Sequence, residues 1–367
     1  VLEKGGSALA AALGGGPVAG GGGGNGGEPG YVPNVYLVTG FAEDRLKLGL
    51  GINSPFGLLT KYDADWVGRY HAIKSDLLTV NINPALSYEV NDYLSLGGGV
   101  SVMYADAELT NAVDFGTVGV AALGPQTAAQ FGLLPQAADG RAIVEGDDWG
   151  VGYSLGALLT LGDTKFGVHF RSKVDLSLRG EGSFELPQNA RPLTATGLFS
   201  ESDVQADVTL PETIAFDVRH DITEDWYAAF GALWTRWNRL DELRVVFDNA
   251  AQPDSVIPLA WDPTWRFAWG TGYRVSDTLT VRGGLTYEET PISSGDFRTP
   301  RIPDNDRFWV ATGLTYSMSD SFDIDFSYSH VFVEDAKSNV LSPTGNTLDG
   351  EYALTTDIVA LAFTYRN

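Results

Sequence analysis

Hydrophobic and polar residues alternate along most of this chain, from about residue 31 to its end. In the run SFDIDFSYSHVF, residues 321–332, Phe322 and Ile324 share one face and Asp323 and Asp325 share the other. Period-two alternation is typical of β-strands with one apolar face. TLTVRGGLTYE, WRFAWGTGYRV and DWYAAFGALW repeat the pattern over about ten residues, the length that a tilted strand needs to cross a bilayer. The pattern predicts an all-β fold, an antiparallel transmembrane β-barrel.

The connections between these segments alternate in length. The short ones contain EVNDY, GDTK, HDITED, VSDT and MSDS, and the long ones cover residues 106–148, 179–206, 248–263, 289–307 and 335–351. This is typical of a barrel with short periplasmic turns and long outer loops. Trp and Tyr favour the membrane interfaces. The aromatic residues expected there are Tyr93, Phe166, Trp226, Phe322 and Tyr365 on the turn side and Trp149, Trp265 and Trp309 on the loop side.

The pattern gives about thirteen strands, whereas bacterial single-chain barrels normally have an even number. We therefore expect one strand, and anything before it, to be missing, so that residues 1–30 form a Gly-rich outside loop and residues 31–367 form the barrel. The predicted strands lie near 31–41, 45–53, 66–90, 93–106, 148–161, 165–179, 206–220, 225–247, 264–275, 278–289, 307–318, 321–334 and 351–366.

Composition excludes several classes of function. A net charge of −23, from 24 Lys and Arg against 47 Asp and Glu, argues against nucleic-acid binding, which needs clustered cations. The chain has no Cys, and its four His lie on scattered strands without a nucleophile motif, so we expect neither an enzyme nor a cofactor. The acidic stretches DADW and PDNDR resemble cation ligands, but their spacing alone predicts no metal site.

The stretch SPFGLLTKYDADWVGRYHA, residues 54–72, interrupts the alternation between two strands. Pro cannot donate to a ladder and Gly weakens it, so both residues mark loops, bulges or breaks in a sheet. An outer loop over residues 54–65 accounts for Pro55 and Gly57. It leaves Gly68 and Arg69 unexplained, because the strand that follows is longer than a bilayer requires.

Two long loops, 106–148 and 179–206, are more apolar than solvated loops should be. Either they expose an apolar groove for a ligand or they pack on each other to cap the barrel. The candidate ligand-binding residues are Phe115, Phe131, Leu133, Leu134, Phe184, Leu186, Leu198 and Phe199. Arg171, Lys173 and Arg266 on inward faces are candidate partners for a carboxylate, with ion pairs to Asp175 and its neighbours as the alternative.

Four segments make the chain resemble the outer-membrane long-chain fatty-acid transporter family of the FadL type, which includes channels for aromatic hydrocarbons. They are SPFGLLTKYDADWVGRYHAIKSDLLTVNINPALSY, FRSKVDLSLRG, TLPETIAFDV and RTPRIPDNDRFWVATGLTY. The resemblance implies a monomeric fourteen-stranded barrel in the outer membrane of a Gram-negative bacterium, in contact with lipid and lipopolysaccharide. It also implies an N-terminal hatch with an Asn-Pro-Ala motif. No hatch is recognisable here, INPA at 82–85 falls inside a strand, and Asn367 replaces the usual final Phe.

The resemblance implies passive uptake of hydrophobic molecules, long-chain fatty acids or aromatic hydrocarbons. In this family the outer loops bind the ligand first, and an inward kink in the third strand opens the wall for lateral exit. We expect that kink at residues 66–70, with Phe56, Trp66, Gly68, Arg69 and Tyr70 around the opening. The alternatives are a polar-solute porin, because the hatch is not recognisable, and a structural or adhesive barrel without transport.

Overall fold

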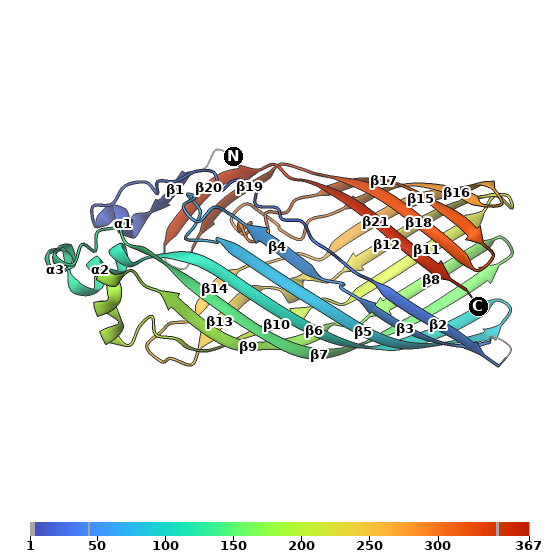
Figure 1. Cartoon of the computed structure of the whole chain (residues 1–367), viewed down its shortest axis with the longest axis horizontal. Helices are drawn as coiled ribbons and strands as arrows, with labels where there is room; N and C mark the ends of the chain where they lie inside the picture. The colour runs from blue at the N-terminus through green and yellow to red at the C-terminus, as the bar shows by residue number, and fades with distance from the viewer. Residues whose placement is uncertain (1–3, 43–44, 343–344, 367) are drawn as a thin grey trace.

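The computed structural model describes residues 4–42, 45–342 and 345–366, so Asn367 lies outside the described residues. The chain forms an elongated closed barrel with short turns at one end and loops and helices at the other (Figure 1). Within the described part, thirteen strands follow one another in a single antiparallel ladder. They are β2 (Val35–Phe41), β3 (Leu46–Asn53), β5 (Lys74–Asn91), β6 (Leu94–Asp114), β7 (Asp139–Leu161), β8 (Thr164–Arg171), β11 (Thr213–Asp221), β12 (Trp226–Thr235), β15 (Thr264–Ser276), β16 (Leu279–Glu288), β17 (Arg307–Ser319), β18 (Phe322–Val333) and β21 (Thr355–Tyr365).

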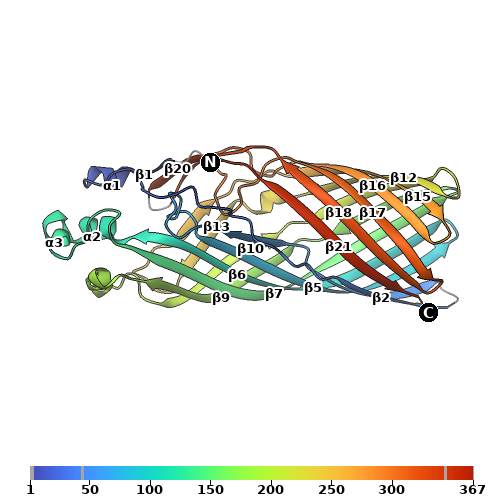
Figure 2. The same ribbon diagram turned by 45° about the horizontal axis from the view of Figure 1, so that its top comes forward.

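This ladder confirms the predicted antiparallel barrel and its thirteen strands. Its first and last strands, β2 and β21, border the seam of the barrel, where the described residues show no pairing between them, and both are exposed along nearly their whole length (Figure 2). The exposed face of β17 carries Phe308, Val310 and Leu314, which are 43%, 42% and 38% exposed. In water that face would be costly, whereas in hydrocarbon it is the expected outer surface of a spanning strand.

The predicted interface aromatics are mostly on this outer face. Trp149, Trp226 and Trp265 are exposed. Trp309 is an exception, because it alternates with the exposed Phe308 and Val310 and therefore faces the inside of the barrel. Its prediction as an interface residue was wrong.

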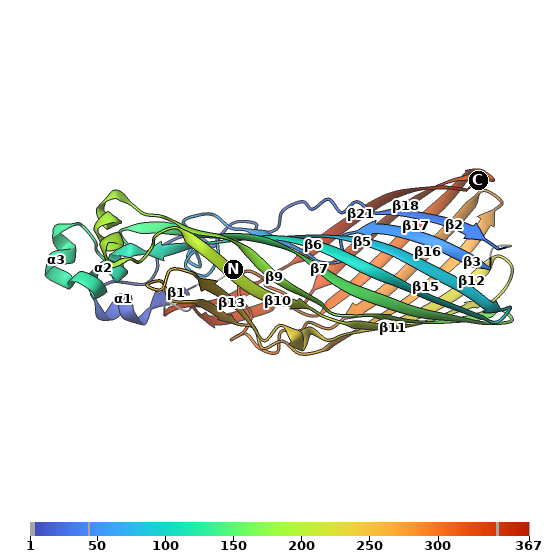
Figure 3. The same ribbon diagram turned by 90° about the horizontal axis from the view of Figure 1, so that it is seen from below.

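The wall continues toward the outer end on one side of the barrel (Figure 3). There β7 also pairs with β9 (Val174–Glu185), which pairs with β10 (Ser202–Leu210), which pairs with β13 (Glu242–Phe247), and β13 pairs with β14 (Ser255–Pro258). β6 and β7 extend into this region as well. The prediction of a loop over residues 106–148 was therefore wrong at both ends, since only residues 115–138 lie between these strands.

The remaining elements are small and lie toward the outer end of the barrel (Figure 1). They are β1 (Lys4–Ser7), α1 (Ala8–Ala12), β4 (Gly57–Lys61), α2 (Phe115–Leu123), α3 (Pro125–Gln130), the 3-10 helices η1 (Gln188–Thr196) and η2 (Trp237–Arg239), β19 (Ala336–Leu341) and β20 (Asn346–Tyr352). Strands β1, β20 and β19 form a separate three-stranded sheet. Among the described residues, no helix is long and apolar enough to span a membrane.

Candidate functional site

The ladder is interrupted between β3 and β4. Asn53 pairs with Asn81 and Gly57 pairs with Leu78, so three residues, 54–56, stand opposite two on β5. Such a count is that of a β-bulge, which bends a strand. The fully buried Thr79 holds the bulge, because its hydroxyl accepts from the Phe56 amide at 3.1 Å and donates to the Phe56 carbonyl. The interruption therefore lies at residues 54–56.

The other edge of this stretch is nearly unpaired. β2 reaches only to Val35, opposite Ile52. Beyond it, the backbone pairing of β4 on this side, among the described residues, is the bridge of Gly27 to Thr60 with the hydrogen bond from the Lys61 amide to the Gly26 carbonyl, at 3.0 Å. Residues 54–59 thus border an interval of the wall without a ladder.

Inside the barrel, an apolar collar lies at the level of this break. We use this name for the buried cluster of Met103, Ala105, Val174, Leu176, Leu178 and Leu210, together with Phe56, which packs against it. Phe56 also meets Trp237 edge to face, with ring centroids 6.1 Å apart. Trp237 follows β12, which lies on another part of the wall. The contact between Phe56 and Trp237 therefore joins apolar side chains from two parts of the wall.

An apolar cavity of about 150 Å³ lies on the loop side of the collar. Along β6 the inward side chains run from Ser101 through Met103 and Ala105 to Ala107 and Leu109, and the last two line the cavity. Most of its other lining residues are apolar as well. Apart from Asp76 and Glu145, these other lining residues carry no charge. The full set is Leu58, Asp76, Leu77, Val144, Glu145, Gly146, Leu176, Leu178, Val204, Ala206, Val208, Leu210, Leu240, Leu243, Val245, Leu259, Trp261 and Ile302.

A more polar cavity of about 210 Å³ lies on the turn side of the collar. Asn53, Asn81, Asn83 and Ser101 line it, together with Arg171. The lumen therefore changes from polar to apolar at the collar. An apolar molecule is therefore favoured on the loop side of the collar and disfavoured on its turn side.

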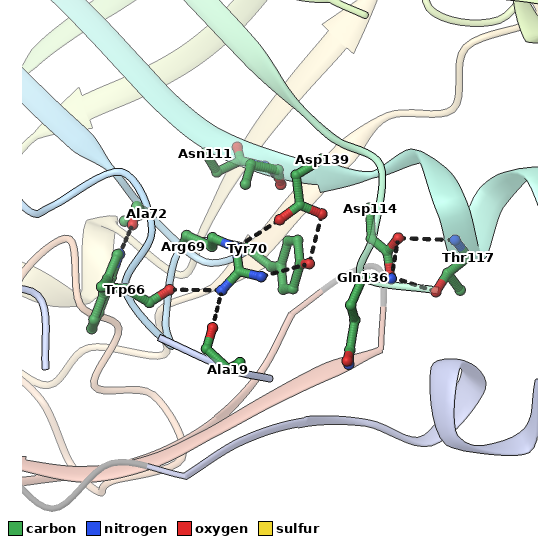
Figure 4. Close-up of polar contacts among 11 residues, drawn as sticks. Ala19, Trp66, Arg69, Tyr70, Ala72, Asn111, Asp114, Thr117, Gln136 and Asp139 are labelled. Atoms are coloured by element: carbon green, nitrogen blue, oxygen red, sulfur yellow. Dashed lines mark hydrogen bonds and ion pairs between the residues drawn. The ribbon is translucent and has the colours of Figure 1, made fainter. Parts of the chain in front are cut away.

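Residues 66–70, where the sequence places the kink, form a turn in the outer loops (Figure 4). Arg69 donates to Asp139 through Nε and to the Ala19 carbonyl through Nη1, both at 2.8 Å, and the Tyr70 hydroxyl donates to Asp139 at 2.8 Å. Burial, followed by the Asp139 carboxylate, raises the pKa of Tyr70 far above its usual range. This network ties the turn to the start of β7 and to the Gly-rich segment.

The Gly-rich segment passes directly over Trp66. Gly23 has a φ of +83°, and a Cβ there would lie 2.9 Å from the Tyr62 and Trp66 rings, which stack at 4.3 Å. A Cβ on Gly68 would lie 2.3 Å from the Trp66 ring. Gly68 therefore serves close packing with Trp66 in the outer loops, away from the ladder break.

The eight predicted loop residues differ in exposure. Phe115 and Leu133 are fully buried in a cluster with α2, α3 and η1, and Leu186 and Phe199 pack against it. The ring of Phe184 stacks with that of Phe247, and Leu198 is half-buried. Phe131 and Leu134, by contrast, are 44% and 51% exposed. The buried members favour the alternative in which the loops pack on each other. Phe131 and Leu134 are left as exposed candidates.

The three residues predicted as carboxylate partners lie in different surroundings. Arg171 lines the polar cavity. Lys173 pairs with Asp175 at 2.7 Å, and Arg266 is exposed in β15 opposite Glu288. The acids of PDNDR have internal partners, for example Thr290 and Arg307. In the described part of the chain, no group of three His, Cys, Asp or Glu is placed to hold a metal ion.

The family model described as "Outer membrane protein transport protein (OMPP1/FadL/TodX)" matches residues 10–367. The chain belongs to this family. The long-chain fatty acid transport protein of Salmonella typhi is 28% identical over 319 residues, which cover 84% of this chain and 71% of that protein. The family places the chain in the outer membrane of a Gram-negative bacterium, as a multi-pass transport channel for hydrophobic molecules and not an enzyme.

Two solved structures share the fold of this FadL-family chain. A Pseudomonas aeruginosa FadL homologue matches with a TM-score of 0.86 and 24% identity, covering 96% of this chain and 82% of its own. The P. putida toluene transporter TodX matches with a TM-score of 0.70 and 17% identity, covering 99% and 87%.

Sequence reasoning missed the apolar cavity, although a signal for it exists. In DVQADVTL, residues 203–210, Val204, Ala206, Val208 and Leu210 alternate with Asp203, Gln205, Asp207 and Thr209. The apolar side faces the cavity and the polar side faces out, the reverse of a strand in a bilayer. Such an inverted strand beyond the membrane indicates an apolar lumen.

Proposed function

We propose that this chain is a passive channel that takes up hydrophobic molecules, long-chain fatty acids among them, and releases them sideways through the wall at residues 54–59. The ladder break carries the proposal, because Phe56 belongs to the collar and Leu58, two residues further, lines the apolar cavity. A molecule in that cavity lies beside the interval without a ladder. The names of the curated relatives support fatty acids as cargo.

A lateral route fits the physical chemistry of the cargo. Moving on along the axis would take an apolar chain past the collar into the polar cavity, which costs about 25 cal/mol for each Å² of apolar surface returned to water. Moving sideways takes it into the hydrocarbon of the outer leaflet. Unpaired backbone groups at such a break are tolerated only where they line a water-filled or protein-lined space.

The test removes the bulge without touching the cavity. Deleting Pro55 leaves two residues opposite two and restores regular pairing between β3, β4 and β5. We expect the variant to fold, to bind oleate and to lose uptake, because the strand no longer bends at residues 54–56, beside the interval without a ladder. Uptake of labelled oleate is measured in cells without another transporter and divided by surface abundance.

Pro55→Ala is the matched control, since it keeps three residues opposite two, and its uptake should stay close to that of the parent. Normal uptake by the deletion variant at normal abundance would refute the lateral exit. Two rival functions make different predictions: a polar-solute porin should pass ions along its axis, and an adhesive barrel should bind no ligand.

Other parts of the expected architecture belong to the same proposal. We propose that the fourteenth strand of the family plan pairs at the seam between β2 and β21, and that the barrel works as a monomer in contact with lipid and lipopolysaccharide. The exposure of both seam strands supports the first point. Phe131 and Leu134, exposed on the outer loops, are proposed as a first contact for cargo.

A further inference from the structure

The wall has a second interruption, beside β7. The ladder of β7 with β8 ends at Ser154, and its ladder with β9 resumes only at Asp147. Between these points, the described structure shows no ladder joining residues 148–153 of β7 to residues 172–178 opposite them. At the same level of the wall, residues 211–212 separate β10 from β11. Two neighbouring lines of strands therefore break together.

The chain that follows β8 lies against the inner face of β7. Gly150 and Gly152 of β7 alternate with the exposed Val151, so both glycines face inward. A Cβ on Gly150 would lie 2.4 Å from the Val174 side chain. One on Gly152 would lie 2.9 Å from the Ser172 hydroxyl. Since Val174 also belongs to the collar, the chain steps inward at this point and leaves a hollow on the outer side of the wall.

A cavity of about 610 Å³ lies at this step. Part of its lining is outward and apolar, since it includes the exposed Val100, Val151 and Tyr153. Phe170 completes this part, with its ring centroid 5.8 Å from that of Tyr153. The exposed Trp149 follows Val151 toward the loop side on the same face of β7. Because Trp favours the membrane interface, the cavity lies at the head groups of the outer leaflet.

The rest of the lining is charged. It consists of Lys173, Asp175, Glu212 and Arg239, apart from Ser172 and Gly152. Lys173 pairs with Asp175 at 2.7 Å. Glu212 is 9% exposed and accepts from Arg239 Nε at 3.0 Å and Nη2 at 2.8 Å, and from Arg236 Nη1 at 3.1 Å. Three cations therefore stand beside two acids, in a chain whose net charge is −23.

The two guanidiniums keep donors to spare. Among the described residues, Arg239 Nη1 and Arg236 Nε and Nη2 have no acceptor. The buried Glu212 fixes the position of both groups, so their remaining N–H donors are pre-organised for an anion. Guanidinium groups suit phosphate, which accepts their parallel hydrogen bonds. Asp106 and Asp147 do not line the cavity, so they leave its excess of cations intact.

We infer that this cavity binds lipid A, the phosphorylated glycolipid of the outer leaflet, with a phosphate at Lys173 and Arg239 and an acyl chain along Val151 and Phe170. The inference rests on the proposed contact with lipopolysaccharide and gives that contact a site. Cargo is a poorer occupant, because the apolar part of the lining faces away from the lumen. A phospholipid is also disfavoured, because the loop side of the barrel meets the leaflet that lipid A fills.

The experiment compares lipid A that carries both phosphates with the same lipid A after dephosphorylation. Equilibrium binding of each is measured with the purified barrel in detergent. The parent chain should bind the phosphorylated form at least about tenfold more tightly, given the usual strength of charge-assisted hydrogen bonds. Lys173→Gln combined with Arg239→Gln should bring the two affinities within about threefold of each other, by weakening the phosphorylated form alone.

Arg244→Gln combined with Arg274→Gln is the matched control, because it removes two cations as well. Both residues are exposed and paired with acids, Arg244 with Glu242 and Asp254 and Arg274 with Asp225, and neither lines the cavity. This variant should keep the preference for the phosphorylated form. Heat-modifiable migration verifies that each variant folds. Should the Lys173 and Arg239 double variant not fold, Lys173→Gln alone, at an exposed position, should reduce the preference at least about threefold.

The outcomes separate this site from the channel. A parent chain that binds both forms equally, or a Lys173 and Arg239 variant that keeps the full preference, overturns the inference. So does phosphatidylglycerol, if it binds as tightly as lipid A and depends as strongly on these two residues. Uptake of oleate, divided by surface abundance, should be the same in this variant and the parent, and its loss would place the cavity on the path of cargo and contradict the inference. A parent chain that binds no lipid A but takes up oleate refutes the contact and leaves the channel standing.

Discussion

At the scale of single residues, Thr79 determines the shape of the ladder break. Its hydroxyl supplies the acceptor for the Phe56 amide and the donor for the Phe56 carbonyl where β5 cannot supply them. A chain without this hydroxyl would leave two partly buried backbone groups unpaired.

Thr79→Val removes the hydroxyl and keeps the side-chain shape. We expect the free energy of unfolding to fall by about 1–3 kcal/mol, the usual cost of an unsatisfied buried group. Urea unfolding of the barrel in lipid vesicles, followed by Trp fluorescence, measures the change. Thr79→Ser keeps the hydroxyl, so its free energy of unfolding should fall by less. Equal losses in the two variants would mean that packing, and not the hydroxyl, holds the bulge.

His71 predicts a pH dependence of stability. Its pKa is about 4 in the folded barrel, against about 6.5 in the unfolded chain. Between these values the unfolded chain binds a proton that the folded barrel refuses, so stability falls as pH drops from 6.5 to 4, by up to about 3 kcal/mol. His71→Gln should lose this part of the dependence, measured as unfolding free energies at pH 7 and 4.5. His220→Gln, at an exposed position, should retain it.

At the scale of elements, the spanning strands are predictable from sequence and the ladder break is not. Strands in a bilayer must alternate, so β17 and β18 were predicted to within a residue or two. β6 beyond Asp106 was missed because its outward residues there, such as Glu108, are polar. The bulge was missed because nothing local in residues 57–61 shows that they pair again with residues 74–78.

The candidate site was harder to predict than the fold. Phe115 and Phe131 have similar sequence surroundings, yet one is fully buried and the other exposed. Arg301, a buried residue in the loop between β16 and β17, reads as an ordinary loop cation, because only the packing of distant segments, among them Lys74 and Asn111, removes it from water. Long-range burial of this kind leaves no local pattern.

A further prediction at this scale concerns the apolar collar. Replacing Met103 and Leu176 together by Ala removes two of its larger side chains. We expect the parent barrel to show little ion conductance in a planar bilayer. The double variant should show a marked increase, because water can then connect the apolar cavity on the loop side of the collar with the more polar cavity on its turn side. A large conductance in the parent chain would support the porin alternative. Val310→Ala, on the outer face, serves as a control and should change nothing.

At the scale of the whole molecule, the proposed function separates the route along the barrel axis from a route sideways through the wall. The outer end of the barrel carries packed loops, its lumen holds the apolar collar, and its wall lacks a ladder on one side of residues 54–59. Each of these features comes from a different part of the chain. Under the proposed function, their combination distinguishes a channel for hydrophobic molecules from a water-filled pore.

The collar also bears on the permeability barrier of the cell. Small hydrophilic antibiotics cross an outer membrane through continuous aqueous paths, and the collar places the apolar side chains of Met103, Val174 and Leu176 inside the barrel. Under the proposed function, we expect many copies of this barrel to leave a bacterium no more sensitive to such drugs. For this reason, we expect selection on the collar to act through the exclusion of toxic compounds as much as through the uptake of nutrients.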